Sequence, residues 1–354
     1  FLMKFANGKV TVAGDTAVAA PTERATSSYT VDRSMGPVLS FNTYNDIFHF
    51  LGEPTYGNIE GEQGDWEFVI TKLTEDSIFV KGKKWENEMV FTRMADGVDW
   101  TSYLDSIADV QKRLGVNYSV GNSSDASKMV EINSATRRIL SRTADGQMVE
   151  QPFYVTPTGI HAVNEPVALG EDKAQDFLVS KAGVLTAKDN ENLTLNSYAP
   201  GIDTWVGKWT LSAMQGSCDM TISKVEDQEN MLKGTFTTGG YTYNIGLSFN
   251  PETGALNLPS QLIDDPSGRY PALWLMNADL NKGTLLGQGG MNVVWHGVSQ
   301  EGDFEDDGTL ASEGYASDTF IALACTAKGE PIKENNQYVF VIEWYYLSNL
   351  TPNK

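Results

Sequence analysis

Apolar and polar residues alternate with a period of two along much of the chain, which is the pattern of strands with one buried face. In Tyr241–Phe249 the odd positions are Tyr, Tyr, Ile, Leu and Phe, and the even positions are Thr, Asn, Gly and Ser. Near the start of the chain, Asn7-Gly8 separates two apolar runs, and this dipeptide accepts the positive φ angles of a tight type I′ turn. These patterns predict a strand at 241–249 and a hairpin over residues 1–13.

The same kind of pattern predicts further strands in both halves of the chain. In the first half they are Val38–Phe41, a three-strand meander over 66–94, and strands at 129–133, 137–142, 147–155, 160–163 and 177–179, the last of which could instead be a short helix. In the second half they are 272–278, 291–298, 319–326 and 338–347. The second set is long enough for an antiparallel β-barrel or a two-sheet β-sandwich.

Two segments have the spacing of helices instead. Thr43 is placed to cap a helix that runs to about Leu51, with Asp46 at the third helical position to complete the capping interaction. Asp99 is placed to cap a second helix over 100–114, in which apolar residues form one stripe of 3.6-residue period. The expected fold is therefore mainly β (α+β), with two helices among N-terminal antiparallel meanders.

A chain of 354 residues exceeds what one hydrophobic core usually absorbs. The segment Asn190–Asp203 is polar and contains Pro200-Gly201, which is typical of a domain boundary. We therefore expect an N-terminal α+β domain over 1–200 and a C-terminal all-β domain over 203–354. The order meander, helix, meander in the first domain suggests an internal duplication.

Charge and hydropathy exclude some classes of partner. The chain has 26 Lys and Arg against 46 Asp and Glu, a net charge of −20, which repels nucleic acid and anionic headgroups. No apolar run approaches the ~18 residues of a membrane-spanning helix. Cys218 and Cys325 lie in strand patterns with apolar neighbours. They can be two buried thiols, or they can form a Cys218–Cys325 disulfide.

Several strings in the first hundred residues point to a family. They are Leu2-Met3-Lys4-Phe5, Pro37-Val38-Leu39-Ser40-Phe41-Asn42-Thr43-Tyr44-Asn45, Gly64-Asp65-Trp66-Glu67-Phe68-Val69-Ile70 and Phe79-Val80-Lys81-Gly82-Lys83-Lys84. With these strings the chain resembles the domain-of-unknown-function family 4302, lipoproteins of Bacteroidetes, from Phe1 through most of its length.

This resemblance implies an exported protein that is anchored by lipid at the outer membrane or cell surface. It implies a secretion signal and a lipobox cysteine upstream of Phe1, and a TonB-dependent transporter with partner lipoproteins as neighbours. The family brings no established catalytic or binding residues.

The acidic run Asp303–Thr309 has the most specific local pattern. Asp303, Glu305 and Asp307 place carboxylates at alternate positions and Gly308 follows, as in loops that wrap oxygen ligands around calcium. The twelfth position, where a bidentate Glu is expected, is Gly314. A calcium site and a solvated acidic turn are both compatible with this run.

The chain has eight tryptophans, five of them at Trp205, Trp209, Trp274, Trp295 and Trp344 in the second half. Sugars bind through CH groups that lie on aromatic faces, so exposed tryptophans on a β surface suit a glycan platform. Most strand aromatics belong to cores. Trp66, Trp85 and Trp274 neighbour predicted loops and are the candidates for ligand binding.

The sequence contains no recognisable catalytic motif. His49, His161 and His296 are scattered and lack zinc-ligand spacing, so we expect no enzyme. Glu343, in the strand pattern at 338–347, is the one carboxylate with the placement of a glycosidase acid. The preferred hypothesis is a non-catalytic surface lipoprotein that captures a glycan or other nutrient for an outer-membrane uptake system. An adhesive or structural protein that binds other proteins is the first alternative, and a glycoside hydrolase is the second.

Overall fold

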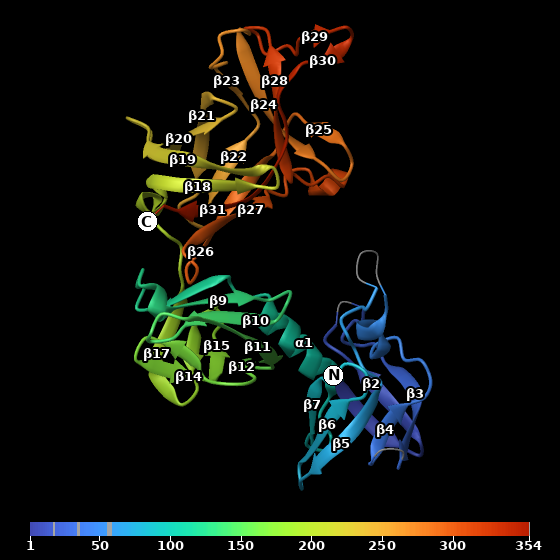
Figure 1. The fold of residues 1–354 in the computed structure, drawn as a ribbon. Helices are drawn as coiled ribbons and strands as arrows, with labels where there is room; N and C mark the ends of the chain where they lie inside the picture. Colours follow the sequence, from blue (N-terminus) through green and yellow to red (C-terminus); the bar gives the residue numbers. More distant parts are fainter. Residues whose placement is uncertain (17, 34–35, 55–58, 354) are drawn as a thin grey trace. The chain divides into compact units, whose positions relative to one another are not determined.

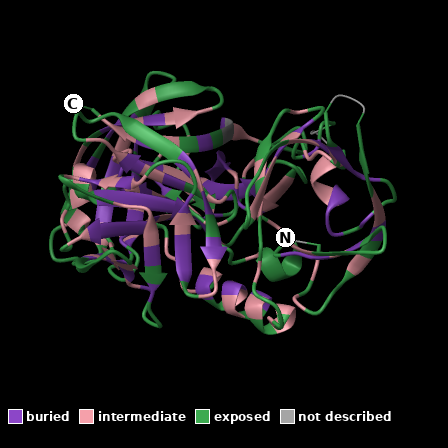
Figure 2. Cartoon of the chain, turned by 90° about the horizontal axis from the view of Figure 1, so that it is seen from below, coloured by how far each residue is buried: buried purple, intermediate pink, exposed green. Residues whose placement is uncertain are grey.

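The computed structural model describes residues 1–16, 18–33, 36–54 and 59–353, except the side chains of 343–345. It divides into two compact units, Phe1–Leu114 with Val155–His161, and Gly115–Tyr154 with Ala162–Lys354 (Figure 1). Figure 2 shows the buried residues on the strands, while most connecting loops are exposed. The fold is mainly β and antiparallel, which confirms the predicted class.

The first unit contains a seven-stranded sheet in which the strands follow one another in sequence order. Asn7 and Gly8 have φ angles of 51° and 71°, and Ala6 pairs with Lys9, so the predicted type I′ hairpin is confirmed. The strands of this sheet are β1 (Leu2–Ala6), β2 (Lys9–Ala13), β3 (Ala25–Asp32), β4 (Val38–Phe41), β5 (Glu67–Leu73), β6 (Ser77–Gly82) and β7 (Glu88–Thr92).

The predicted helix from Thr43 to Leu51 is wrong. The Thr43 hydroxyl accepts a hydrogen bond from the backbone N–H of Ser28 (2.8 Å), so it does not cap a helix. The Asn45 side chain instead accepts from the N–H of Phe48 (3.1 Å) and holds a turn there. The helical segment that follows is only the short 3₁₀ helix η1 (His49–Gly52). The described residues therefore contain one α-helix where the sequence predicted two.

That helix is α1 (Trp100–Gln111), and Asp99 caps it as predicted by accepting from the N–H groups of Thr101 and Ser102. It ends three residues before the predicted Leu114. Its first turn is held by Arg24, which lies 5.6 Å from the Trp100 ring centroid. No helix in the described part of the chain has both the length and the apolar character needed to span a bilayer.

Strands β8 to β17 include a closed barrel in the order β10-β11-β12-β15-β16-β17-β8-β9. Its last strand occupies Asn190–Ser197, where the sequence suggested a polar linker, because Leu193 and Leu195 point inward. The barrel strands are β8 (Asn117–Val120), β9 (Met129–Asn133), β10 (Arg138–Arg142), β11 (Met148–Thr156), β12 (Gly159–Ala162), β15 (Asp176–Val179), β16 (Leu185–Ala187) and β17 (Asn190–Ser197). Strands β13 (Val167–Leu169) and β14 (Asp172–Ala174) form a separate pair, and the short helix η2 covers Ala126–Lys128.

The remaining chain forms one large sheet. β31 pairs with both β27 and β18, so the path β18-β19-β20-β21-β22-β26-β27-β31 closes on itself as an eight-stranded ring, which is the barrel alternative of the prediction. The ring strands are β18 (Gly207–Ala213), β19 (Gly216–Lys224), β20 (Met231–Thr238), β21 (Tyr241–Phe249), β22 (Leu256–Pro259), β26 (Gly290–His296), β27 (Glu301–Asp306) and β31 (Phe340–Pro352). An extension adds β28 (Thr319–Cys325), β24 (Ala272–Asp279), β23 (Gln261–Ile263) and β25 (Thr284–Leu286). The minor elements are β29 (Lys333–Glu334), β30 (Gln337–Tyr338), η3 (Ile202–Trp205) and η4 (Ala311–Glu313).

Three tryptophans form the centre of the ring's core. Trp205, Trp209 and Trp295 are buried, with ring centroids 5.5 to 6.2 Å apart. The indole of Trp205 donates to the Gly254 carbonyl (2.8 Å), so its polar atom is satisfied inside the core.

The two cysteines of this sheet are thiols, so the disulfide alternative is wrong. Cys325 is buried in a small cluster with Ile321 and Leu323, as predicted from its strand pattern. Cys218 is half-buried at the edge of the main core.

The turn between β26 and β27 (residues 297–300), here named the anchor turn, is held by polar side chains of the neighbouring barrel. The buried carboxylate of Glu131 accepts from the N–H groups of Val298 (2.6 Å) and Ser299 (3.1 Å). Asn117 accepts from the Gly297 N–H (2.9 Å), and the Arg142 guanidinium donates to the Val298 carbonyl (2.7 Å). Side chains from three successive barrel strands thus satisfy backbone groups that would otherwise be buried without partners.

His296 completes this interface. Its Nδ1 atom lies 3.1 Å from Glu131 Oε2, and its Nε2 atom lies 3.4 Å from Asp303 Oδ2. The interactions with Asp303 and Glu131 outweigh desolvation and raise the pKa of His296 to about 10. The imidazole is therefore protonated at neutral pH and provides the counter-charge to the buried Glu131.

We predict that Glu131→Ala destabilises the second unit by about 3 kcal/mol, because it leaves the buried N–H groups of Val298 and Ser299 unpaired and removes the counter-charge of His296. Urea unfolding followed by tryptophan fluorescence measures this change. The exposed Glu305 of β27 supplies the control, since Glu305→Ala is expected to change stability by less than about 0.5 kcal/mol. Equal effects of the two substitutions would contradict the assigned role of Glu131.

We also predict that stability falls with rising pH because of His296. The pKa of His296 in the folded protein, about 10, lies above the ordinary value of 6.5, so folding favours the protonated form. Its contribution is complete below pH 6.5 and is lost as the pH rises toward 10. Comparison of wild type with His296→Gln by urea unfolding between these limits isolates the effect. The difference in stability between the two proteins should shrink as the pH rises, and a constant difference would show that this protonation is not linked to folding.

Candidate binding sites

Three aromatic side chains of the first unit, here named the aromatic row, lie side by side near η1. The rings of Tyr44 and His49 are stacked, with centroids 5.3 Å apart and planes 23° apart, and His49 lies 5.5 Å from the ring of Trp66. Tyr44 and Trp66 are 57% and 42% exposed, whereas His49 between them is buried. Solvent therefore meets two aromatic rings that flank a buried imidazole.

Local contacts fix each member of the row. His49 Nδ1 accepts from the Asn45 N–H (2.9 Å), and burial lowers the pKa of His49, so its imidazole is neutral at pH 7. The Tyr44 hydroxyl donates to the Glu53 carboxylate, which raises the pKa of Tyr44 to about 12. A Cβ atom on Gly52 would lie 2.6 Å from Cζ3 of Trp66, so the position of this indole requires glycine there. The rings are consequently held in fixed positions.

Trp85, the second predicted ligand-binding residue, is half-buried, and its backbone bonds to Asp65, the residue before Trp66. Asp65 accepts from the backbone N–H groups of Lys84 (2.8 Å) and Trp85 (3.0 Å), and Trp66 follows Asp65 directly. The Lys84 ammonium lies 4.3 Å from the centroid of the Trp85 ring and covers one of its faces. Asp65 therefore places the backbones of Trp66 and Trp85 close together, with only Trp66 strongly exposed.

Trp274, the third predicted residue, belongs to the second unit. It packs against the cluster of Met276, Ile321 and Leu323 and is half-buried. The structure thus groups two of the three predicted tryptophans within one unit and assigns Trp274 to the other. The other second-half tryptophans lie in the core, except Trp344, whose side chain is outside the described residues.

The predicted calcium ligands do not surround a loop. Asp303 and Glu305 lie in the extended strand β27, and Asp307 follows its end. Asp303 faces His296, and Asp307 accepts from the side-chain amide of Asn257 (3.2 Å). Among the residues that the structure describes, no group of three or more His, Cys, Asp and Glu side chains is arranged to hold a metal ion. A calcium site at Asp303, Glu305 and Asp307 stays a prediction.

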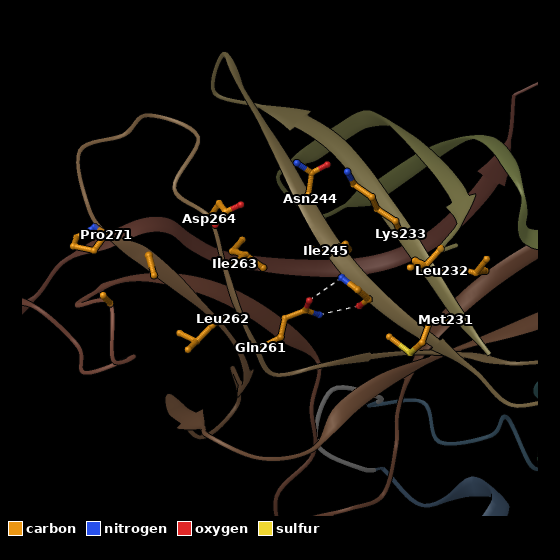
Figure 3. Close-up of a pocket in the computed structure, with 14 residues that line it drawn as sticks. Met231, Leu232, Lys233, Asn244, Ile245, Gln261, Leu262, Ile263, Asp264 and Pro271 are labelled. Atoms are coloured by element: carbon orange, nitrogen blue, oxygen red, sulfur yellow. Dashed lines mark hydrogen bonds between the residues drawn. The ribbon is translucent and has the colours of Figure 1, made fainter. Parts of the chain in front are cut away.

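A groove of about 540 Å³ opens between β21 and β23 in the second unit (Figure 3). Its walls are mainly aliphatic, with Ile245, Leu262 and Ile263 among the lining residues, and it contains the charged side chains of Lys233 and Asp264. The side-chain amide of Gln261 bonds twice to the backbone of Gly246 across one part of the groove, as the dashed lines in Figure 3 show. Among the described residues that line it there is no aromatic ring, so its chemistry differs from that of the aromatic row.

Two of the three histidines are occupied by neighbouring side chains. His49 is enclosed by aromatic rings, and His296 is committed to Glu131 and Asp303. Glu343, the residue on which the hydrolase hypothesis rested, has its side chain outside the described residues.

The comparison with protein families matches residues 1–181 of the chain to the family described as Domain of unknown function (DUF4302). The chain belongs to this family, as its sequence strings suggested. The match covers the seven-stranded sheet, α1 and the barrel strands as far as β15. No curated protein and no solved structure matches the chain significantly.

Trp66 was predicted as a binding residue from the sequence, whereas Tyr44, His49 and Gln261 were not. Tyr44 and His49 were assigned to a helix. Residues five positions apart do not lie on the same face of a helix, so a helix would not have brought these two rings together. The signal that would have corrected this is Asn45, a residue that favours turns through its side-chain amide. Glu131 was also missed, although Met129, Val130 and Ile132 make both faces of that strand apolar and therefore place Glu131 in a buried environment.

We predict that Trp66 accounts for much of the tryptophan fluorescence that a solvent quencher reaches. Acrylamide is the appropriate quencher because it is neutral, whereas the net charge of −20 repels iodide. Trp66→Phe should lower the quenchable fraction clearly, and Trp85→Phe should lower it less, since Lys84 covers that ring. If Trp66→Phe quenches like wild type, the indole is not exposed.

Proposed function

We propose that this protein is a non-catalytic binding protein that captures a glycan on the aromatic row of its first unit. The observation that carries the proposal is the pair of exposed rings, Tyr44 and Trp66, held on either side of the buried His49. Sugar CH groups lie favourably on aromatic faces, and rings that are already fixed lose little entropy when a ligand binds.

Polar groups beside the rings support the same proposal. The Glu53 carboxylate accepts from Tyr44, and Glu53 is exposed, so this carboxylate can also accept from a sugar hydroxyl. The indole N–H of Trp66 offers a donor at the other end of the row. A ligand that combines apolar faces with many hydroxyl groups matches this surface better than a purely apolar or a charged ligand does.

We further propose that the protein works outside the cell, lipid-anchored at the outer membrane or cell surface, beside a TonB-dependent transporter and its partner lipoproteins. The support is the resemblance of the sequence strings in the first hundred residues to lipoproteins of this family. In that setting the aromatic row would hold a nutrient glycan for uptake, and Asp303, Glu305 and Asp307 would bind calcium.

A second candidate function is the binding of another protein at the cell surface. One specific observation favours it, the groove beside β21, and this observation is independent of the aromatic row.

A glycan array with the purified, labelled chain tests the first proposal, run once with calcium and once with chelator. We expect reproducible binding to one class of polysaccharide, with affinity reduced about tenfold in Trp66→Ala and in Tyr44→Ala. The matched control is Tyr241→Ala, which removes an exposed tyrosine from the second unit and should bind like wild type.

Three outcomes decide between the proposals. Loss of binding in chelator would support a calcium site at Asp303, Glu305 and Asp307. Glycan binding that survives both Trp66→Ala and Tyr44→Ala would remove the aromatic row as the site. An array without any reproducible signal would contradict glycan capture and favour the protein-binding function.

A further inference from the structure

Strand β21 has one edge that is only partly paired. β20 pairs with it along its whole length, whereas β22 pairs only with Ser248 and Phe249. The N–H of Phe249 bonds to the Asn230 carbonyl on the β20 side, and both backbone groups of Gly246 bond to Gln261 on the other side. Because backbone groups alternate sides along a strand, those of Thr242 and Asn244 also point away from β20.

The edge of β21 at Thr242 and Asn244 is unpaired among the described residues. No hydrogen bond to the backbone N–H or C=O of Thr242 or Asn244 from that side is found within the described ranges. Their side chains lie on the exposed face, and Asn244 also lines the groove. An edge of this kind accepts an added strand.

Gln261 shows what the edge binds. Its side-chain carbonyl accepts from the Gly246 N–H (2.7 Å), and its side-chain N–H donates to the Gly246 carbonyl (2.9 Å). A primary amide has the same donor and acceptor as a peptide group, so Gln261 takes the place that a residue of a neighbouring strand would occupy (Figure 3). The chemistry that fits the next outward positions, Asn244 and Thr242, is therefore a peptide backbone.

The charge beside the groove selects among peptides. Two segments contribute residues to its lining, 225–233 and 261–265, and together they carry five acidic residues and one basic residue. Of these charged residues, Asp264 and Lys233 line the groove itself, and the other four acidic residues lie near lining residues in the sequence. The acidic residues are Glu226, Asp227, Glu229, Asp264 and Asp265, and the basic residue is Lys233. The local excess is negative, like the −20 of the whole chain, so a basic segment is attracted and a second copy of this chain is repelled.

From these observations we propose that the groove binds an extended, basic peptide segment of a partner protein, which adds as a strand to the edge of β21 at Thr242 and Asn244. Alternate side chains of the bound peptide rest on the aliphatic wall that Leu262 and Ile263 provide. The other side chains, Lys or Arg, face the acidic segments. This site lies in the second unit and does not depend on glycan binding at the aromatic row.

The test uses the full isotope-labelled chain and an eight-residue peptide of alternating Lys and Val. Saturable shifts of the backbone amide signals of Thr242 and Asn244 are expected in NMR spectra. Two matched peptides serve as controls, one with Glu in place of Lys and one with N-methylated Val residues that lack the backbone donors. Both should bind at least about tenfold more weakly than the Lys-Val peptide. Equal binding of the N-methylated peptide would overturn strand addition, and equal binding of the Glu-Val peptide would overturn selection by charge.

A pair of variants at one position separates backbone from side chain. Asn244→Pro removes the outward N–H and should weaken binding of the Lys-Val peptide about tenfold, whereas Asn244→Ala keeps this N–H and should bind like wild type. The peptide controls on the wild-type chain decide the question if Asn244→Pro fails to fold. Trp66→Ala should leave peptide binding unchanged, which keeps this test distinct from the glycan test.

Discussion

The buried carboxylate of Glu131 is the interaction on which the second unit depends. A charge removed from water is tolerated only when its hydrogen-bonding capacity is filled, and here two backbone N–H groups and a protonated imidazole fill it. The partners belong to the end of β26 and to the anchor turn, so the same carboxylate joins the barrel to the ring of strands that follows. The ring in turn places β21 and the groove beside it.

Both candidate sites are placed by small residues and by amide groups instead of by reactive side chains. The Trp66 ring has room beside His49 because Gly52 lacks a Cβ atom, and the side chain of Asn45 holds the turn before His49. In the groove, the side-chain amide of Gln261 occupies the outward N–H and C=O groups of Gly246 on β21. Each of these features fixes a shape or a hydrogen-bonding pattern at the surface.

Local features of the fold could be predicted from the sequence, whereas closure and burial could not. The Asn7-Gly8 hairpin, the Asp99 cap, β4, β9 and β21 depend on neighbouring residues only, and the structure has them where the sequence placed them. The helix at Thr43 failed because a distant N–H, that of Ser28, takes its capping oxygen. The pairing of β18 with β31 joins the two ends of the second half, and no local pattern encodes it. For the same reason Trp66 could be chosen as a surface residue, while the contacts of Glu131 with the anchor turn could not.

An open strand edge also bears on the colloidal behaviour of this chain. Edges such as that of β21 template the growth of aggregates, and natural proteins shield them by charge or by covering groups. Gln261 covers the edge at Gly246. At neutral pH the net charge of −20 makes copies of the chain repel one another, which keeps their uncovered edges apart. That repulsion vanishes near the pI of about 4.5, where the uncovered backbone of one molecule becomes accessible to the next. The acidity of the chain thus makes long-term solubility possible for a protein that keeps a strand edge open.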